Sequence, residues 1–263
     1  MDGAKRDRTI WPGDLGISVL TDYVSLGDLV TIRNSLQTLY NHQDAATGAL
    51  PYAGPAVNFI GNSDAYHLWT LIGTADYVQF TGDTDWIRSV YDAYKRAVAH
   101  IVAKIGADGL LNVTSSADWA RTDSDGKNLE ANAIMYRMLV TAGPLARSVG
   151  DTAAADSYAT LASALKSAID SGGYWDETAG LYRDKPDGPG AGLHPQDGNA
   201  LAVWFGLVDT RNGPGPSAAH SPGAGPRSGR SAPRRVPPRS THSPAAWRCT
   251  PTSQRAVTPP RWT

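Results

Sequence analysis

Apolar residues recur at steps of three and four positions along most of the chain before residue 210. Such spacing places apolar side chains on one face of an α-helix. These stripes cover residues 29–39, 68–75, 86–105 and 154–169, and a shorter apolar segment follows at about 200–208. The pattern therefore predicts an all-α protein.

Short Gly-Asp turns separate consecutive helical stripes. Glycine can adopt the left-handed conformation that ends a helix, and an aspartate side chain can cap the first turn of the next helix. Each turn thus predicts a tight helical hairpin, and the turns recur at intervals of 55 and 68 residues. They lie at Gly27-Asp28, Gly82-Asp83 and Gly150-Asp151.

The connections between hairpins are long and rich in turn residues. In an up-and-down ring of hairpins, the short turns gather at one end and the long connections at the other. Short β-hairpins are expected within these loops, at 109–113 and 180–184. Because loops on a rigid scaffold often carry binding and catalytic residues, one functional face is expected there. The long connections cover residues 1–16, 44–63, 106–127 and 172–197.

The charge divides the chain into two parts. Residues 1–209 hold all 25 acidic residues against 15 Lys and Arg, and the remainder holds nine Arg with no acidic residue. The second part also has eleven of the 18 prolines and no Leu, Ile, Phe or Tyr. It cannot bury enough apolar surface to offset the entropy of ordering it. We therefore expect a folded domain over 1–209 and a disordered Pro/Arg-rich tail over 210–263.

The tail composition fits an out-of-frame or otherwise non-native terminus better than a functional basic arm. Its arginines lack the interleaved aromatic residues that stack on nucleic-acid bases. No apolar run is long enough to cross a bilayer, and no apolar stretch typical of a signal peptide follows Met1. Neither a nucleic-acid nor a membrane partner is expected, and the cytoplasm is the default location. The single cysteine, Cys249, excludes an internal disulfide and a cysteine-based metal site.

The opening segment, "DGAKRDRTIWPGD" at residues 2–14, gathers three aspartates around one tryptophan. Sugars offer C–H faces that stack on aromatic rings and hydroxyls that hydrogen-bond to carboxylates. Cleavage of a glycosidic bond needs one carboxyl group to protonate the leaving oxygen and another to activate water or attack. No nucleotide-binding loop, zinc-binding histidine spacing or serine nucleophile elbow competes with this interpretation. The segment favours a carbohydrate site, with no metal or cofactor.

This segment, with "LLNV…DWAR" at 110–121 and "NLEANAIMYRML" at 128–139, resembles the six-hairpin catalytic domain of bacterial and fungal α-L-rhamnosidases. The resemblance runs from residue 2 to about 209. It implies an (α/α)6 toroid with the site in the loops at one end. The implied reaction is hydrolysis of terminal α-L-rhamnose with inversion, so the implied partner is a rhamnosylated glycoside.

The resemblance also implies roles for individual residues. Asp7 matches the general acid, which is often Glu in the family. The shorter Asp side chain would have to reach further. Asp2 and Asp14 match carboxylates that hold the sugar hydroxyls, Trp11 matches an aromatic wall, and Asp118 and Trp119 resemble another sugar-lining pair. Arg6 is a further substrate-binding candidate, with orientation of a carboxylate as its simpler role.

Each of these residues also has a simpler interpretation. Asp14 could cap a helix, Asp2 and Asp7 could pair with neighbouring cations at the surface, and Trp11 and Trp119 could be core residues. Four further residues are interpreted as structural: Glu130 as stabilising a helix dipole, His67 as a buried structural histidine, Asp176 as a turn residue and Asp197 as an N-cap.

The chain resembles only part of the family's catalytic domain. The family's catalytic base is a glutamate on a later hairpin, and a six-hairpin ring needs about twelve helices. We count three hairpins and one further helix before the composition changes, and the tail holds no acid. We therefore expect an incomplete toroid with little hydrolytic activity by itself. Three alternatives stay open: a sugar-binding remnant, another six-hairpin glycosidase or lyase, and an α-hairpin interaction protein with a basic tail. The sequence does not indicate an oligomeric state.

Overall fold

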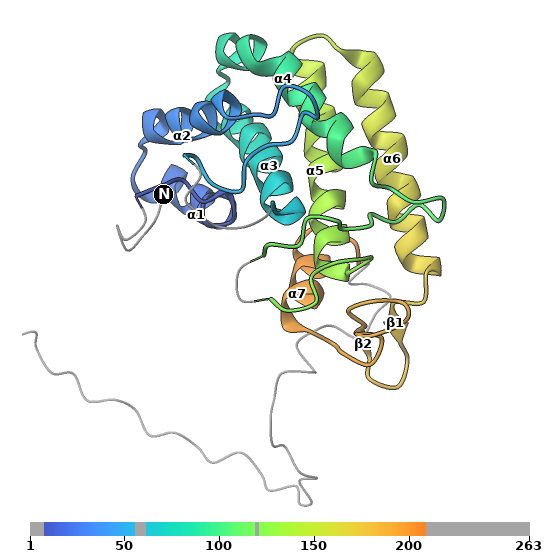
Figure 1. Cartoon of the computed structure of the whole chain (residues 1–263). Coiled ribbons are helices and arrows are strands. Elements are labelled where there is room, and N and C mark those ends of the chain that lie inside the picture. Colours follow the sequence, from blue (N-terminus) through green and yellow to red (C-terminus); the bar gives the residue numbers. More distant parts are fainter. Residues whose placement is uncertain (1–7, 56–61, 119–120, 209–263) are drawn as a thin grey trace, which may run out of the picture. The chain divides into compact units, whose positions relative to one another are not determined.

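The computed structural model describes residues 8–55, 62–118 and 121–208 (Figure 1). The expected tail, 210–263, lies outside them. The described part is mainly helical, as the apolar stripes predict, and none of its helices is long and apolar enough to cross a membrane. The helices are α1 (Pro12–Ser25), α2 (Leu29–Asn41), α3 (Asp64–Thr81), α4 (Thr84–Val102), α5 (Leu129–Ser148), α6 (Thr152–Ser171) and α7 (Gln196–Trp204).

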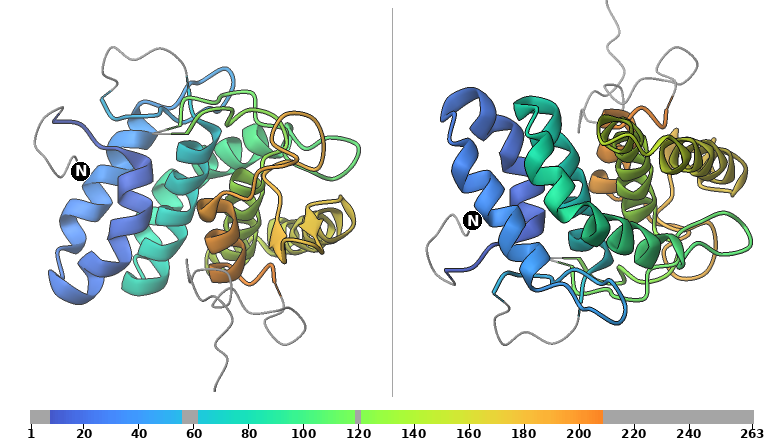
Figure 2. Two further views of the ribbon diagram at one scale, coloured as in Figure 1. Left: turned by 90° about the horizontal axis from the view of Figure 1, so that it is seen from below. Right: turned by 90° about the horizontal axis from the view of Figure 1, so that it is seen from above.

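The helices form two layers. The odd-numbered helices pack in a row, with α3 between α1 and α5 and with α7 against α5 (Figures 1 and 2). The helices α2, α4 and α6 pack outside this row, α2 and α4 on α3 and α6 on α5. Successive hairpins therefore pack side by side with their odd-numbered helices in one row, as expected of neighbouring hairpins in an (α/α)6 toroid.

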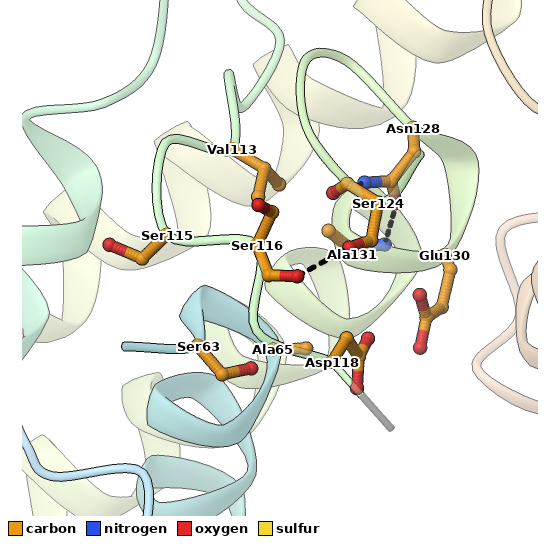
Figure 3. Close-up of a pocket in the computed structure, with 10 residues that line it drawn as sticks. All are labelled: Ser63, Ala65, Val113, Ser115, Ser116, Asp118, Ser124, Asn128, Glu130 and Ala131. Atoms are coloured by element: carbon orange, nitrogen blue, oxygen red, sulfur yellow. Dashed lines mark hydrogen bonds between the residues drawn. The ribbon is translucent and has the colours of Figure 1, made fainter. Parts of the chain in front are cut away.

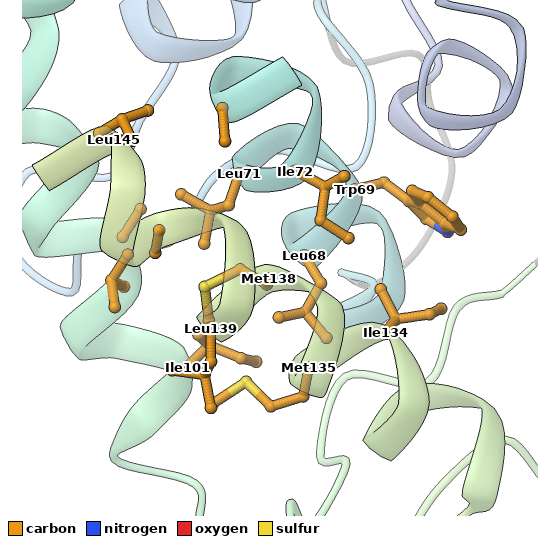
Figure 4. Packing of buried hydrophobic residues seen from close by; sticks show 14 of the residues in the cluster. Leu68, Trp69, Leu71, Ile72, Ile101, Ile134, Met135, Met138, Leu139 and Leu145 are labelled. Atoms are coloured by element: carbon orange, nitrogen blue, oxygen red, sulfur yellow. The ribbon is translucent and has the colours of Figure 1, made fainter. Parts of the chain in front are cut away.

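The sequence of α3 reflects its central place. Its buried residues lie all around its circumference, whereas those of α4 form one stripe. A helix enclosed on every side must be apolar or small on every side, while an outer helix needs one apolar face. The buried side chains form one core cluster with members in every helix, and part of it lies between α3, α4 and α5 (Figure 4). It includes Leu68, Leu71 and Ile72 of α3, Ile101 of α4, and Met135, Met138 and Leu139 of α5.

The Gly-Asp turns form as the sequence predicts. Gly27, Gly82 and Gly150 all adopt positive φ angles, of 64°, 67° and 89°. Each following aspartate caps the next helix by accepting a backbone hydrogen bond three residues on. The distances are 3.0 Å from Thr31 N to Asp28 Oδ1, 3.1 Å from Trp86 N to Asp83 Oδ1 and 3.0 Å from Ala154 N to Asp151 Oδ1.

The long loops hold less β-structure than expected. Strands β1 (Trp175–Asp176) and β2 (Leu181–Tyr182) form the predicted hairpin near 180–184. The segment 109–113 is not a strand, and its residues Leu111 and Val113 make only isolated bridges, to Ile105 and Gly126. Its backbone is held by a helix side chain instead, because Leu111 N donates to Asn132 Oδ1 of α5 (2.9 Å).

Candidate active site

The long loops meet at the amino-terminal ends of the odd-numbered helices. Because the hairpins alternate in direction, α1, α3, α5 and α7 run the same way, and each follows a long connection. The partial positive charge of each helix start therefore faces this end, where it favours carboxylates. The predicted functional face is thus the amino-terminal end of the inner row of helices.

The loop that carries Asp118 is bound tightly to the start of α3. Ser63 and Ser116 form an antiparallel bridge, Asp64 N donates to Ser115 O (2.8 Å), and Ala117 N donates to Asn62 O (3.1 Å). The buried carboxylate of Asp64 accepts from the backbone amides of Thr114 (3.0 Å) and Ser115 (3.2 Å). These contacts fix the backbone that leads directly to Asp118.

Asp118 lines a small pocket between this loop, the start of α3 and the first turn of α5 (Figure 3). The volume of the pocket, about 10 Å³, is close to the minimum needed to hold one water molecule. Ser63 and Ala65 line it from α3, and Asn128, Glu130 and Ala131 line it from the start of α5. The carboxyl groups of Asp118 and Glu130 lie on the same side of this pocket in Figure 3.

Arg121 joins four segments of this face through its guanidinium group. Its Nε lies 3.1 Å from Glu130 Oε2 at the start of α5. Its terminal nitrogens donate to Asp184, in the loop after β2, and to Asp197, in the first turn of α7. The arginine side chain is 10% exposed. A planar guanidinium with five donors suits such multiple carboxylate contacts.

Two carboxyl groups of this cluster, those of Glu130 and Asp184, have raised pKa values. Burial raises the pKa of the Glu130 carboxyl to about 8, and repulsion by Asp118 adds to the shift more than attraction by Arg121 removes. Burial also raises the pKa of Asp184, against the opposing effect of Arg121. A carboxyl group with a strongly raised pKa beside other carboxylates is typical of functional sites.

Glu130 is the residue whose role the sequence interpretation understated. It does lie in the first turn of α5, as a dipole-stabilising residue would, but its side chain is 13% exposed and faces a carboxylate cluster. A first-turn glutamate is common in surface helices, so only the spatial convergence of Asp118 and Arg121 on it reveals the difference. Asp197 likewise is not an N-cap. The N-cap of α7 is Pro195, and Asp197 binds Arg121 from the first turn.

The structure describes three of the predicted site residues. Trp11 is the N-cap residue of α1 and is half-buried, with its ring 6.0 Å from that of Tyr52 and 6.4 Å from that of Tyr66. Asp14 is exposed in the first turn of α1 and is not its cap. Asp118 lines the pocket described above. The others, Asp2, Arg6, Asp7 and Trp119, lie outside the described residues.

The aromatic group and the carboxylate pocket are neighbours because both rest on the start of α3. Tyr66 N donates to the N-cap side chain of Ser63 (3.1 Å), and Ser63 itself lines the pocket. The segment before Trp11 is fixed by two backbone hydrogen bonds of 3.0 Å between Ile10 and Gly54. Trp11, through Tyr66, and the pocket, through Ser63, therefore both adjoin the start of α3.

Two residues given structural roles from the sequence have them. The buried ring of His67 accepts from Leu50 N through Nδ1 (3.0 Å) and bonds Ala97 O through Nε2 (2.9 Å). Asp176 closes the β1–β2 turn by accepting from Thr178 N (3.0 Å) and Ala179 N (3.2 Å).

Comparison with solved structures identifies the same fold. The chain is similar to a GH78 family rhamnosidase of Bacillus sp. GL1, with a TM-score of 0.67, 23% identity, and coverage of 76% of this chain and 21% of that one. It is similar to a rhamnosidase from Klebsiella oxytoca with rhamnose bound, with a TM-score of 0.65, 24% identity, and coverage of 79% and 40%. An α-L-rhamnosidase from Dictyoglumus thermophilum gives a TM-score of 0.60, 20% identity, and coverage of 76% and 22%.

The chain thus spans between 21% and 40% of the length of these three proteins. No curated protein matches it. The family model described as the bacterial alpha-L-rhamnosidase six-hairpin glycosidase domain matches residues 1–220. The match covers most of the sequence and includes the charged opening segment together with every described helix. The chain therefore belongs to the bacterial α-L-rhamnosidase six-hairpin glycosidase family.

Proposed function

We propose that this chain carries the rhamnose-binding half of an α-L-rhamnosidase site, which hydrolyses terminal α-L-rhamnose from glycosides with inversion. The observation that carries the proposal is the juxtaposition of Trp11 and Asp118 at the start of α3. It supplies an aromatic face and a carboxylate at one end of the helical row. Family membership adds the reaction class.

In this proposal Asp7 is the general acid that protonates the leaving oxygen. Asp2, Asp14 and Asp118 accept hydrogen bonds from sugar hydroxyls, Trp11 and Trp119 pack on the sugar ring, and Arg6 orients a carboxylate. An inverting pair of carboxyl groups lies roughly 6.5–9.5 Å apart, with room for the attacking water. Asp2, Arg6 and Asp7 precede α1 in the sequence. Ile10, just before this helix, is hydrogen-bonded to Gly54.

We propose further that this chain alone hydrolyses rhamnosides only weakly. The family assigns the base to a glutamate, and the sequence has two, Glu130 and Glu177. Glu130 is bound by Arg121 at the pocket, and Glu177 is exposed in the β1–β2 turn. We therefore propose that neither of them serves as the catalytic base.

Calorimetric titration with L-rhamnose and an aryl α-L-rhamnoside tests the proposal, with D-glucose as the control sugar. We expect L-rhamnose to bind, and D118N and W11A to weaken that binding about tenfold, the loss typical of a charge-assisted hydrogen bond or a stacked ring. Asp156, exposed on α6, provides the matched control D156N. Binding without product would identify a sugar-binding remnant. Equal affinity for both sugars, or none for either, would overturn the proposal.

A further inference from the structure

The carboxylate cluster at the start of α5 contains more negative charge than its cation can balance. Three carboxyl groups, from Glu130, Asp184 and Asp197, contact the guanidinium of Arg121. Asp118 adds a fourth negative group that acts on Glu130. With all four ionised, one positive charge would face four negative ones in a partly buried site, where such repulsion is weakly screened.

Among the described residues, no second cation contacts Glu130, Asp184 or Asp197; Lys185 acts on the neighbouring Asp184 by its charge, but it is bound to Asp125, 3.0 Å from Nζ to Oδ1. From α3, the pocket is lined by Ser63 and Ala65, which carry no charge. The adjacent Asp64 is already bound by Lys104, 2.6 Å from Nζ to Oδ1. From the loop after β2 and from α7, the groups that face Arg121 are Asp184 and Asp197. Excess negative charge of this kind is relieved when one carboxyl group keeps its proton.

The contacts indicate which carboxyl group keeps the proton. Asp184 and Asp197 both accept hydrogen bonds from Arg121. For Asp184 this contact favours the ionised form and opposes the effect of burial. Glu130 Oε2 lies 3.1 Å from Arg121 Nε, but among the described residues neither atom has a hydrogen bond of good geometry. Glu130 and Asp118 line the same small pocket with their carboxyl groups on one side of it (Figure 3), and a side-chain hydrogen bond between them is among the causes that raise the pKa of Glu130. Two carboxyl groups can share a hydrogen bond only when one of them is protonated.

We propose that Glu130 is a positioning residue that, as a neutral carboxylic acid, donates a hydrogen bond to Asp118 and fixes the Asp118 carboxylate toward the bound sugar. The part of this inference that concerns the sugar rests on the proposed function. Arg121 holds Glu130 at this place, and the bonds from Arg121 to Asp184 and Asp197 join the loop before α5 to the loop after β2 and to α7. Asp118 keeps its negative charge and remains an acceptor for a sugar hydroxyl.

This arrangement makes sugar binding sensitive to alkaline pH. The pKa of Glu130 is raised to about 8 by burial and by Asp118, so the proton is lost only above neutrality. Once it is lost, two carboxylates face each other, and the hydrogen bond that fixes Asp118 is gone. Affinity for the sugar then falls as the pH rises through this pKa.

The first experiment measures the proton directly, without any sugar. Glu130 and Glu177 are the two glutamates of the whole sequence, so selective 13Cδ-glutamate labelling gives two NMR carboxyl signals. The E177Q variant assigns them, and exposed Glu177 serves as the internal reference. We expect the Glu130 signal to titrate at alkaline pH and D118N to lower its midpoint by about one pH unit or more, because the like charge is removed. A Glu130 midpoint near that of Glu177, unchanged in D118N, would overturn the proposal.

The second experiment tests positioning by conservative rescue, using calorimetric titration with L-rhamnose between pH 6 and 9. Glutamine at 130 keeps a neutral hydrogen-bond donor of the same length, whereas alanine removes it. We expect E130Q to bind as wild type does at pH 6 and to show no alkaline loss, and E130A to bind about tenfold more weakly. Circular dichroism confirms that both variants fold. Equal weakening in E130Q and E130A, or an alkaline loss retained in E130Q, would overturn the positioning role.

The NMR titration and the rhamnose-binding experiment can each give a negative result independently of the other. If no form of the chain binds rhamnose, the proposed function fails, and with it the role of Glu130 toward a sugar, while the NMR titration still decides whether Glu130 and Asp118 share a proton. If rhamnose binds but Glu130 titrates normally, the proposed function stands and the shared proton is wrong.

Discussion

Lys104 and Asp64 form a buried ion pair behind the pocket, with 2.6 Å between Lys104 Nζ and Asp64 Oδ1. The same carboxylate accepts from the backbone amides of Thr114 and Ser115. One side chain at the start of α3 therefore neutralises a buried cation and holds the loop that leads to Asp118. The pair links the stability of the fold to the shape of the pocket.

The first prediction concerns this pair. Removal of the carboxylate in D64A leaves Lys104 buried without its partner and two amides without an acceptor. We expect a loss of about 3–5 kcal/mol in the free energy of unfolding, the range for breaking a buried ion pair. Urea denaturation measures it. The matched control is D85N, at an exposed aspartate that pairs with Arg88 on α4, which should change stability by less than about 0.5 kcal/mol. A loss in D64A no larger than in the control would contradict the role assigned to Asp64.

The second prediction concerns His67, which is buried and bonded as a neutral ring. Burial lowers its pKa to about 4, from an ordinary value of 6.5. The unfolded chain therefore binds a proton near pH 6.5 while the folded chain does not. The stability that the neutral ring contributes is present above pH 6.5 and is lost as the pH falls toward 4.

We expect this loss to reach at most about 3 kcal/mol, from 1.36 kcal/mol per unit of pKa difference. Denaturation of wild type and H67Q at pH 7, 6, 5 and 4.5 measures it, because glutamine does not titrate. The difference between the two proteins should shrink toward acid. Exposed His42 offers the matched control variant H42Q. A constant difference for H67Q would mean that His67 titrates alike in both states.

The third prediction compares Gly82, a turn glycine whose backbone conformation favours glycine, with Gly143, a helix glycine for which it does not. Gly82 has a φ of 67°, and a Cβ at this position would meet no atom within 4 Å. A G82A variant should therefore lose about 1 kcal/mol through conformation alone. Gly143 lies inside α5, where a Cβ would lie 3.7 Å from Ala155 O in ordinary contact. G143A should accordingly be neutral or stabilising by up to about 1 kcal/mol, because alanine favours the helix. Thermal denaturation of both variants checks the contrast, and equal effects would contradict it.

The fold could be predicted from the sequence because its main signals are local. A stripe of apolar residues reports one helix face, and Gly27-Asp28 reports a turn from two adjacent residues. Both depend on neighbours within one or two helical turns. The segment 109–113 differs from the predicted strand because its backbone bonds partly to Asn132, a side chain about twenty residues away, and otherwise makes only isolated bridges. No local pattern encodes such a contact.

The candidate site likewise contains residues that a local motif identifies and one whose role depends on contacts with distant segments. Asp118 and Trp11 could be named as candidates by resemblance, since the motif that carries each is contiguous. Glu130 could not, because its chemistry depends on Asp118, Arg121 and Asp197, which come from separate segments. By itself, "NLEAN" is an ordinary helix start. Burial and the neighbours that the loops bring together around Glu130 raise its pKa, which a first-turn glutamate at the surface would not show.

The fourth prediction tests the raised pKa of Glu130 through stability. Here the folded pKa, about 8, lies above the ordinary value of 4.5. A carboxyl group of this kind binds its proton more tightly in the folded chain. Its contribution to stability is therefore fully present below pH 4.5, is lost as the pH rises toward 8, and stays lost at higher pH. This is the opposite of the behaviour of a carboxylate that is stabilised in its ionised form.

Glutamine at position 130 removes this titration while keeping size and hydrogen bonding. We expect E130Q to gain stability relative to wild type steadily between pH 4.5 and 8, by about 1–4 kcal/mol in all, and to gain no more above pH 8. Urea denaturation across this range measures the gain, and E177Q, at an exposed turn, should show none. Removal of the Asp118 charge in the double variant D118N/E130Q should add little further pH dependence, because the repulsion acts between these two groups. A gain for E130Q that is the same at pH 5 and pH 8 would show that Glu130 ionises as freely in the folded chain as in the unfolded one.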